Sequence, residues 1–83
     1  MSEVILYTRH GCHLCDEAQA LLEQLRQRAE FSLAVIDVDR DPALQAKFTN
    51  EVPVVFIGGR KAFKYRVNPE EFLRRLSSAR NRR

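Results

Sequence analysis

Residues 4–15 read VILYTRHGCHLC, and this stretch decides the expected fold and chemistry. A strand-like apolar run, within a strand expected at 3–8, is followed by a short polar loop at 9–11 and then by Cys12 and Cys15. These are the two cysteines of the chain, and they stand at the start of a long amphipathic helix pattern. Because a helix start stabilises a thiolate and this spacing lets a disulfide close, the stretch predicts a dithiol redox protein.

The length of 83 residues suits one compact domain, which we expect at 1–79, followed by a basic tail at 80–83. The longest apolar stretches are too short to cross a membrane, and the N-terminal residues lack the basic and apolar segments of a secretory signal. We therefore expect a cytoplasmic protein, in which an isolated C-x-x-C is catalytic or metal-binding. The net charge of +3 is modest, and the chain shows no nucleic-acid motif, so we expect no nucleic-acid partner.

The helix pattern after the cysteines extends from Cys12 to about Ala29. Its apolar residues recur at helical spacing on one face and are Leu14, Ala18, Leu21, Leu22, Leu25 and Ala29. The next run, Phe31–Val38, is almost continuously apolar, which favours a strand covered on both faces in a parallel sheet. Strand, helix and strand in this order predict a right-handed βαβ unit.

Local signals place a short helix and a third strand next. Asp41 suits the N-cap, and Pro42 suits the first helical position because its missing N–H would be unpaired there. The helix is expected over residues 43–49, and residues 53–57 read as the third strand.

The last third of the chain predicts a hairpin and a helix. Gly58-Gly59 suits the hairpin turn, and residues 61–67 alternate like an edge strand with protective outward cations. The alternation places Phe63, Tyr65 and Val67 on one side and Ala62, Lys64 and Arg66 on the other. Residues 68–71 start the last helix, with Glu71 at the capping-box position.

This element order, with C-x-x-C at the first helix and Val52-Pro53 before the third strand, resembles the thioredoxin fold. The short length and residues 6–15 resemble the glutaredoxin branch of that fold, and the resemblance covers about residues 3–79. It implies an α/β domain of βαβαββα type, with a four-stranded mixed sheet in the order 2-1-3-4 flanked by three helices. It also implies that the bond before Pro53 is cis and that Pro53 packs beside the dithiol.

The chain departs from glutaredoxins at two places. His13 and Leu14 stand where many glutaredoxins have proline and tyrosine, and residues 65–68 replace the Gly-Gly and acidic residue that hold glutathione. The chain also has no tryptophan, which thioredoxins carry just before the first cysteine. These departures weigh against glutathione as a ligand.

The chemistry expected of the pair is disulfide exchange. Cys12 is the candidate nucleophile, because its sulfur would face the unpaired N–H groups and the positive dipole end of the helix. Cys15 would be the resolving thiol that attacks the mixed disulfide. A static disulfide is the alternative, but so short a loop is a poor staple for a fold.

Four further residues are candidates for substrate binding. Arg9 resembles the basic residue with which glutaredoxins hold a glutathione carboxylate, and the alternative is a solvated loop cation. Protonated His13 would stabilise the Cys12 thiolate, or it is a solvated residue of the first turn. Pro53 would hold Val52 so that its backbone N–H and C=O face the substrate.

We expect no metal and no resident cofactor. His10, Cys12, His13 and Cys15 supply four candidate zinc ligands, but a helix starting at Cys12 would splay the histidines, and no second ligand pair exists. Glutathione is a doubtful candidate reductant, and a separate reductase is the other possible electron donor.

The sequence therefore predicts a glutaredoxin-like enzyme that reduces protein or small-molecule disulfides as a monomer away from membranes. The alternative is a non-catalytic module of the same fold that binds metal or reports the redox state to a partner.

Overall fold

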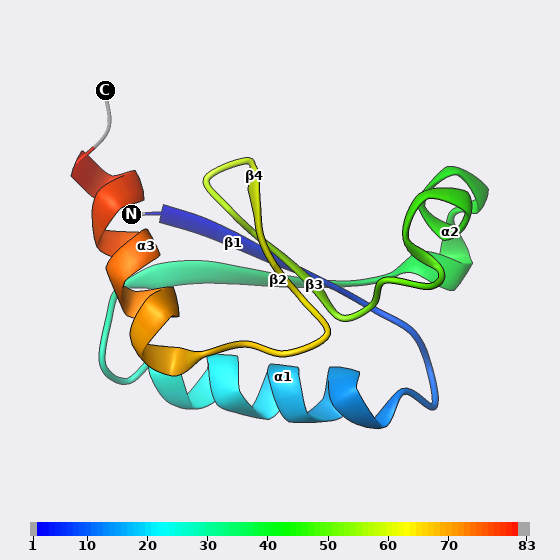
Figure 1. Cartoon of the computed structure of the whole chain (residues 1–83), viewed down its shortest axis with the longest axis horizontal. Helices are drawn as coiled ribbons and strands as arrows, with labels where there is room; N and C mark the ends of the chain where they lie inside the picture. Colours follow the sequence, from blue (N-terminus) through cyan, green and yellow to red (C-terminus); the bar gives the residue numbers. More distant parts are fainter. Residues whose placement is uncertain (1, 82–83) are drawn as a thin grey trace.

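The computed structural model describes residues 2–81, within which the chain forms four strands, three α-helices and one 3-10 turn (Figure 1). In chain order these are β1 (Ser2–Thr8), α1 (His13–Leu25), β2 (Phe31–Asp37), η1 (Val38–Arg40), α2 (Pro42–Phe48), β3 (Val54–Ile57), β4 (Arg60–Lys64) and α3 (Pro69–Asn81). The expected βαβαββα order is confirmed. Helix α3 includes residues 80 and 81 of the expected basic tail, while residues 82 and 83 lie outside the described part.

The four strands form one mixed sheet in the order β2-β1-β3-β4, as expected. Strands β1 and β2 are parallel, and β3 is antiparallel to both β1 and β4. The register pairs Tyr7 with Val54, so the end of β1 lies beside the start of β3. The loop that carries Cys12 and the segment that carries Pro53 therefore meet at the same end of the sheet.

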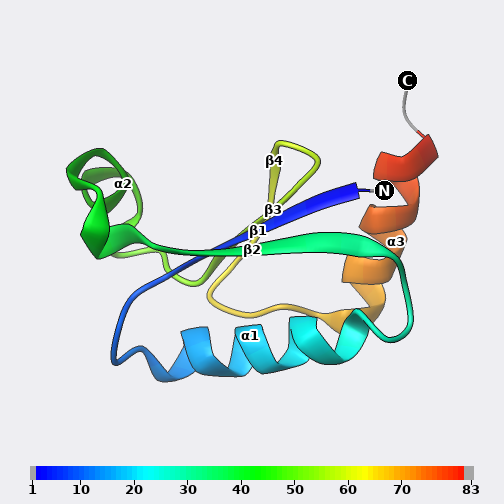
Figure 2. The same ribbon diagram turned by 180° about the vertical axis from the view of Figure 1, so that it is seen from behind.

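Helices lie on both faces of the sheet. Figures 1 and 2 show α1 running along one face, α3 at the end where β1 begins, and α2 beyond the opposite end. The main core lies between the sheet, α1 and α3, and its buried residues are Val4, Leu6, Ala18, Leu22, Leu25, Phe31, Val55, Ile57, Phe72 and Leu76. A smaller core under α2 holds Val38, Phe48 and Val54. Neighbouring residues of a strand face opposite sides of the sheet, so Val54 belongs to this core and Val55 to the main one.

Strand β2 is less covered than its apolar sequence predicts. It is an edge strand that ends at Asp37, and Ser32, Ala34 and Val35 are exposed. The prediction of burial on both faces is wrong, because α2 is short and packs at one end of the second face only.

Helix α1 begins and ends inside its predicted range. It begins at His13 because Cys12 is its N-cap, and it ends at Leu25. The hydrogen-bond pattern after Leu25 changes from the α-helical to the 3-10 type. The N–H of Arg28 donates to the carbonyl of Leu25 at 2.9 Å, an i to i−3 bond that is common at helix ends. Ala29 packs against the main core from the turn after the helix. This is why the apolar spacing in the sequence extends beyond the end of α1.

Strand β4 departs most from its prediction. The register between β3 and β4 shifts by one residue at Ala62, which is the signature of a β-bulge. The strand then stops at Lys64, since Tyr65 adopts a left-handed φ of 72°. The expected alternation is therefore wrong: Ala62, Phe63 and Val67 all pack against the main core, and Tyr65 is exposed.

Two predicted helix starts are present. Asp41 caps α2 by accepting a hydrogen bond from the N–H of Ala43 at 2.9 Å, and Asn68 accepts one from the N–H of Glu71 at 2.9 Å. Glu71 does not complete a capping box, because its carboxylate pairs with Arg74 and Arg75 instead.

Candidate active site

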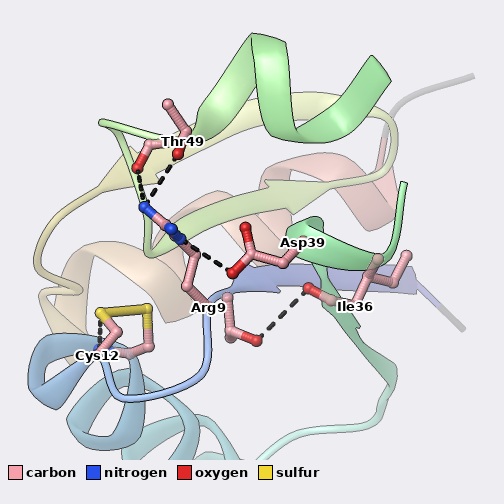
Figure 3. The surroundings of a disulfide bond; sticks show 7 residues. Arg9, Cys12, Ile36, Asp39 and Thr49 are labelled. Carbon is pink, nitrogen blue, oxygen red and sulfur yellow. Dashed lines mark hydrogen bonds and ion pairs between the residues drawn. A yellow bond between two sulfur atoms is a disulfide. The ribbon is translucent and has the colours of Figure 1, made fainter. Parts of the chain in front are cut away.

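Cys12 and Cys15 are joined by a disulfide at the start of α1 (Figure 3). Their Cα atoms are 5.1 Å apart, and Cys12 is the extended N-cap residue of the helix. Its sulfur accepts a hydrogen bond from the N–H of Cys15 at 3.1 Å. Gly11, at a φ of 76°, makes the turn that brings the chain into the helix, which a residue with a side chain rarely adopts.

The two cysteines differ in accessibility. Cys12 is half-buried, whereas Cys15 is 1% exposed and lies on the core side of the helix. Cys12 is therefore the more accessible of the two sulfurs, and Cys15 lies where its sulfur bonds directly to that of Cys12. The division into nucleophile and resolving thiol stays a prediction, and this difference in accessibility is compatible with it.

Pro53 lies at the end of the sheet where the Cys12 loop begins. The Val52–Pro53 bond is cis, as the family resemblance implied, and Pro53 is buried. Val52 is half-buried, and within residues 2–81 its backbone N–H and C=O have no hydrogen-bond partner. These two groups are therefore unpaired in this part of the chain, and their predicted role in binding a substrate stays a prediction.

Arg9 is held by the protein itself (Figure 3). Its Nε donates to Oδ2 of Asp39 at 3.2 Å, and its Nη1 donates to Oγ1 of Thr49 at 2.9 Å and to the Thr49 carbonyl at 3.4 Å. The structure thus engages Arg9 between two other segments of the chain, and binding of a substrate by Arg9 stays a prediction.

His13 lies on the solvent side of α1. Its side chain is 85% exposed, and its Nε2 lies 2.8 Å from Oε2 of Glu17 one turn further along the helix. The Glu17 carboxylate is therefore the neighbour of the His13 ring in the structure. The predicted role of His13 in stabilising a Cys12 thiolate remains untested.

A groove of about 300 Å³ lies between α1 and the segment after β4. Its lining is mixed polar and apolar and consists of Leu14, Glu17, Ala18, Leu21, Tyr65, Arg66 and Val67. Leu14, which stands between the two cysteines in the sequence, is the lining residue nearest to them along α1. Tyr65 forms a wall of this groove instead of continuing the side of a regular strand with Phe63 and Val67, because its backbone is left-handed, a conformation that a tyrosine does not signal in the sequence.

Tyr65 also supports the segment that leads to Pro53. Its hydroxyl donates to the carbonyl of Asn50 at 3.0 Å, and its backbone N–H donates to the carbonyl of Pro53 at 2.8 Å. Beside it, Lys61 pairs with Glu51 at 2.6 Å, and this hydrogen bond lowers the pKa of the Glu51 carboxyl.

Residues 2–81 contain neither a cluster of metal-binding side chains nor a membrane-spanning helix. Among residues 2–81, no three histidine, cysteine or acidic side chains gather closely enough to hold a metal ion. The helices described there are also too short or too polar to span a membrane.

The fold and the site together define a thioredoxin-like protein with a C-x-x-C disulfide at its first helix and a cis-proline before its third strand. The model of the glutaredoxin-like domain family (DUF836) matches residues 3–77, so the chain belongs to this family.

Relatives of known sequence agree with this assignment. An uncharacterised protein of Mycobacterium tuberculosis is 36% identical over 64 residues, which are 71% of this chain and 66% of that protein. A glutaredoxin-like protein of Dictyostelium discoideum is 32% identical over 71 residues, 78% of this chain and 66% of its own length. The chain thus spans just under two thirds of the length of these relatives.

Solved structures show the same fold. Protein Ne2328 of Nitrosomonas europaea superposes with a TM-score of 0.78 at 30% identity, over 90% of this chain and 91% of that one. Oxidised mitochondrial thioredoxin 3 of Saccharomyces cerevisiae gives a TM-score of 0.71 at 21% identity, over 93% of this chain and 77% of its own. The second likeness concerns the fold alone.

Proposed function

We propose that this protein is a thiol–disulfide oxidoreductase that reduces disulfides through the Cys12/Cys15 pair. The observation that carries the proposal is the unequal placement of the two sulfurs at the start of α1. Cys12 is the accessible N-cap, and Cys15 is buried one turn inside. A thiolate at Cys12 would receive the N–H of Cys15 and face the positive end of the helix dipole, both of which stabilise it.

The proposed reaction has two exchange steps. The Cys12 thiolate attacks one sulfur of a substrate disulfide, forms a mixed disulfide, and releases the other substrate sulfur as a thiolate that takes up a proton. The Cys15 thiolate then attacks the Cys12 sulfur, releases the second substrate thiolate, and leaves the Cys12–Cys15 disulfide. Two electrons pass to the substrate, and an external thiol or dithiol reductant restores the pair.

The proposed substrates are protein or small-molecule disulfides. The unpartnered backbone groups of Val52 and the groove at Leu14 support an extended ligand that lies beside Cys12. The electron donor would be glutathione or a reductase of the thioredoxin type. The proposed setting is a monomer in a reducing compartment such as the cytoplasm, where C-x-x-C pairs are typically catalytic.

Two variants test this proposal. Cys12→Ser should abolish reduction of insulin and of small disulfides, while Cys15→Ser should accumulate a mixed disulfide that mass spectrometry detects. The double variant serves as the control and should trap nothing. Parallel assays with glutathione and with thioredoxin reductase as the donor would identify the reductant.

Three results would contradict the proposed oxidoreductase activity. Small and equal effects of the two single variants would contradict the proposed reaction. Partner binding that changes with oxidation state without turnover would indicate a redox-sensing adaptor, and stoichiometric zinc or iron in an inactive protein would indicate a metal-binding module.

A further inference from the structure

Arg9 joins three segments of the chain at the active-site end of the sheet (Figure 3). It lies one residue after β1 and three residues before Cys12. Its guanidinium reaches Asp39 in η1 and Thr49 just after α2, which are 30 and 40 positions away in the sequence. Thr49 in turn stands four residues before Pro53.

Asp39, one of the two acceptor residues of Arg9, is itself held by other groups. Oδ1 of Asp39 accepts a hydrogen bond from Nε2 of Gln45 at 3.1 Å, and the N–H of Asp39 donates to Oδ1 of Asp37 at 2.9 Å. The planar guanidinium can serve two acceptors at once with defined geometry, which a lysine cannot reproduce. The contact is therefore a bridge between ordered partners rather than a single surface ion pair.

The opposite side of the segment 49–53 is also anchored. Tyr65 holds Asn50 and Pro53, and Lys61 holds Glu51, all from the β4 side. Within residues 2–81, Arg9 makes the side-chain hydrogen bonds that connect this segment to the loop of Cys12. Arg9 thus adds a side-chain tie to the β1–β3 pairing at Tyr7 and Val54 in fixing the placement of Cys12 relative to the Val52 backbone groups.

We infer that Arg9 is a positioning residue, which holds the Cys12 loop against the segment of Val52, rather than a ligand for a substrate carboxylate. This inference rests on the proposed function, because it concerns the rate at which Cys12 attacks a disulfide lying along Val52. Loss of the bridge lets the two segments move relative to each other, and small misplacements of reacting groups lower rates strongly. The effect does not require the substrate to carry any charge.

The test compares two substrates that differ in charge. Reduction rates are measured with 2-hydroxyethyl disulfide, which is neutral, and with glutathione disulfide, which carries carboxylates. Arg9→Gln and Arg9→Lys should each lower kcat/KM about tenfold or more toward both substrates. Arg40→Gln is the matched control, since it removes a neighbouring exposed arginine that makes no ion pair within residues 2–81, and it should react like wild type.

A double-mutant cycle shows whether the bridge is responsible. The double variant Asp39→Asn/Thr49→Val should lower kcat/KM toward both substrates, and adding Arg9→Gln to it should cause little further loss. Thermal unfolding of each variant identifies an assay temperature at which all are folded, so that a loss of rate is not a loss of folded protein.

Two results would overturn the inference alone. One is an Arg9→Gln loss confined to glutathione disulfide, with Arg9→Lys near wild type, because this is the behaviour of a carboxylate ligand. The other is full additivity of Arg9→Gln with the Asp39/Thr49 double variant. Wild-type protein inert toward both disulfides would instead overturn the proposed function, and this inference with it.

Discussion

The backbone N–H of Cys15 donates a hydrogen bond to the sulfur of Cys12 across 3.1 Å. The bond exists because Cys12 has the extended backbone of an N-cap, which turns its side chain back over the first helical turn. A cysteine sulfur thus occupies the capping position that serines and aspartates usually fill. The same geometry leaves Cys12 accessible and places Cys15 in the core.

We expect the reduced protein to be alkylated selectively at Cys12. Cys15 is 1% exposed, whereas Cys12 is half-buried and lies at the helix N-terminus, where the proposed function places a thiolate. Iodoacetamide at neutral pH should therefore modify Cys12 at least about tenfold faster than Cys15. Peptide mapping by mass spectrometry over a time course measures the two rates, and equal rates would contradict the assigned roles.

Tyr65→Phe should lower the free energy of unfolding by about 0.5–1 kcal/mol, because the Asn50 carbonyl loses its donor at a solvent-exposed site. Tyr7→Phe is the matched control, since the Tyr7 hydroxyl makes no hydrogen bond within residues 2–81 and its ring packing against Phe48 is kept. Denaturant unfolding of both variants measures the difference. A Tyr65→Phe variant as stable as Tyr7→Phe would argue against this tie.

Leu22→Ala should destabilise the fold strongly. Leu22 is fully buried where α1 packs against the sheet, so its truncation leaves a cavity and costs about 2–5 kcal/mol. Each kcal/mol corresponds to a decrease in Tm of roughly 4–8 °C in a domain of this size. Gln24→Ala, at an exposed position of the same helix, should change little, and a comparable loss there would contradict burial as the cause, since alanine favours helix at least as well as glutamine.

Glu71 should stabilise the protein in a pH-dependent way. Hydrogen bonds from Arg74 and then Arg75 lower the pKa of its carboxyl below the ordinary value of 4.5. A lowered pKa in the folded state means that the stabilisation is present above the unfolded pKa and is lost as the pH falls through the folded one. Glu71→Gln should therefore be less stable than wild type at neutral pH and approach it in acid.

Glu70→Gln is the control for this prediction, since Glu70 also lies in the first turn of α3 but forms no ion pair within residues 2–81. Urea unfolding measured from about pH 7 to below pH 3 follows the difference between each variant and wild type. A Glu71→Gln difference that stays constant into strong acid would show that the ion pairs are not its cause.

The sequence predicted the architecture well because the decisive signals are local. Helix starts at Asp41 and Asn68 depend on side chains that hydrogen-bond to backbone groups two or three residues away. The order of strands and helices then leaves few allowed topologies for the sheet. The cis bond at Pro53 came from the resemblance to a family and not from local chemistry.

The predictions failed where packing between distant segments overrides a local pattern. The alternation after residue 60 suggested a regular strand, but the bulge at Ala62 and the left-handed Tyr65 bring consecutive side chains to the same core. The apolar residues of β2 predicted burial on both faces of that strand. How much of the second sheet face is covered depends on the length and position of α2, which is short.

The amino-acid order alone determined that two thiols begin a helix and that the elements follow in the order βαβαββα. The spacing of apolar residues and the helix caps that indicate these elements depend on residues close together in the sequence. Only the tertiary structure decided that the Arg9 guanidinium donates hydrogen bonds to Asp39 and Thr49. The same holds for the hydrogen bond from the Tyr65 hydroxyl to the Asn50 carbonyl. These partners lie 15 to 40 positions apart. Their meeting depends on how three segments converge at one end of the sheet, which no short-range pattern encodes.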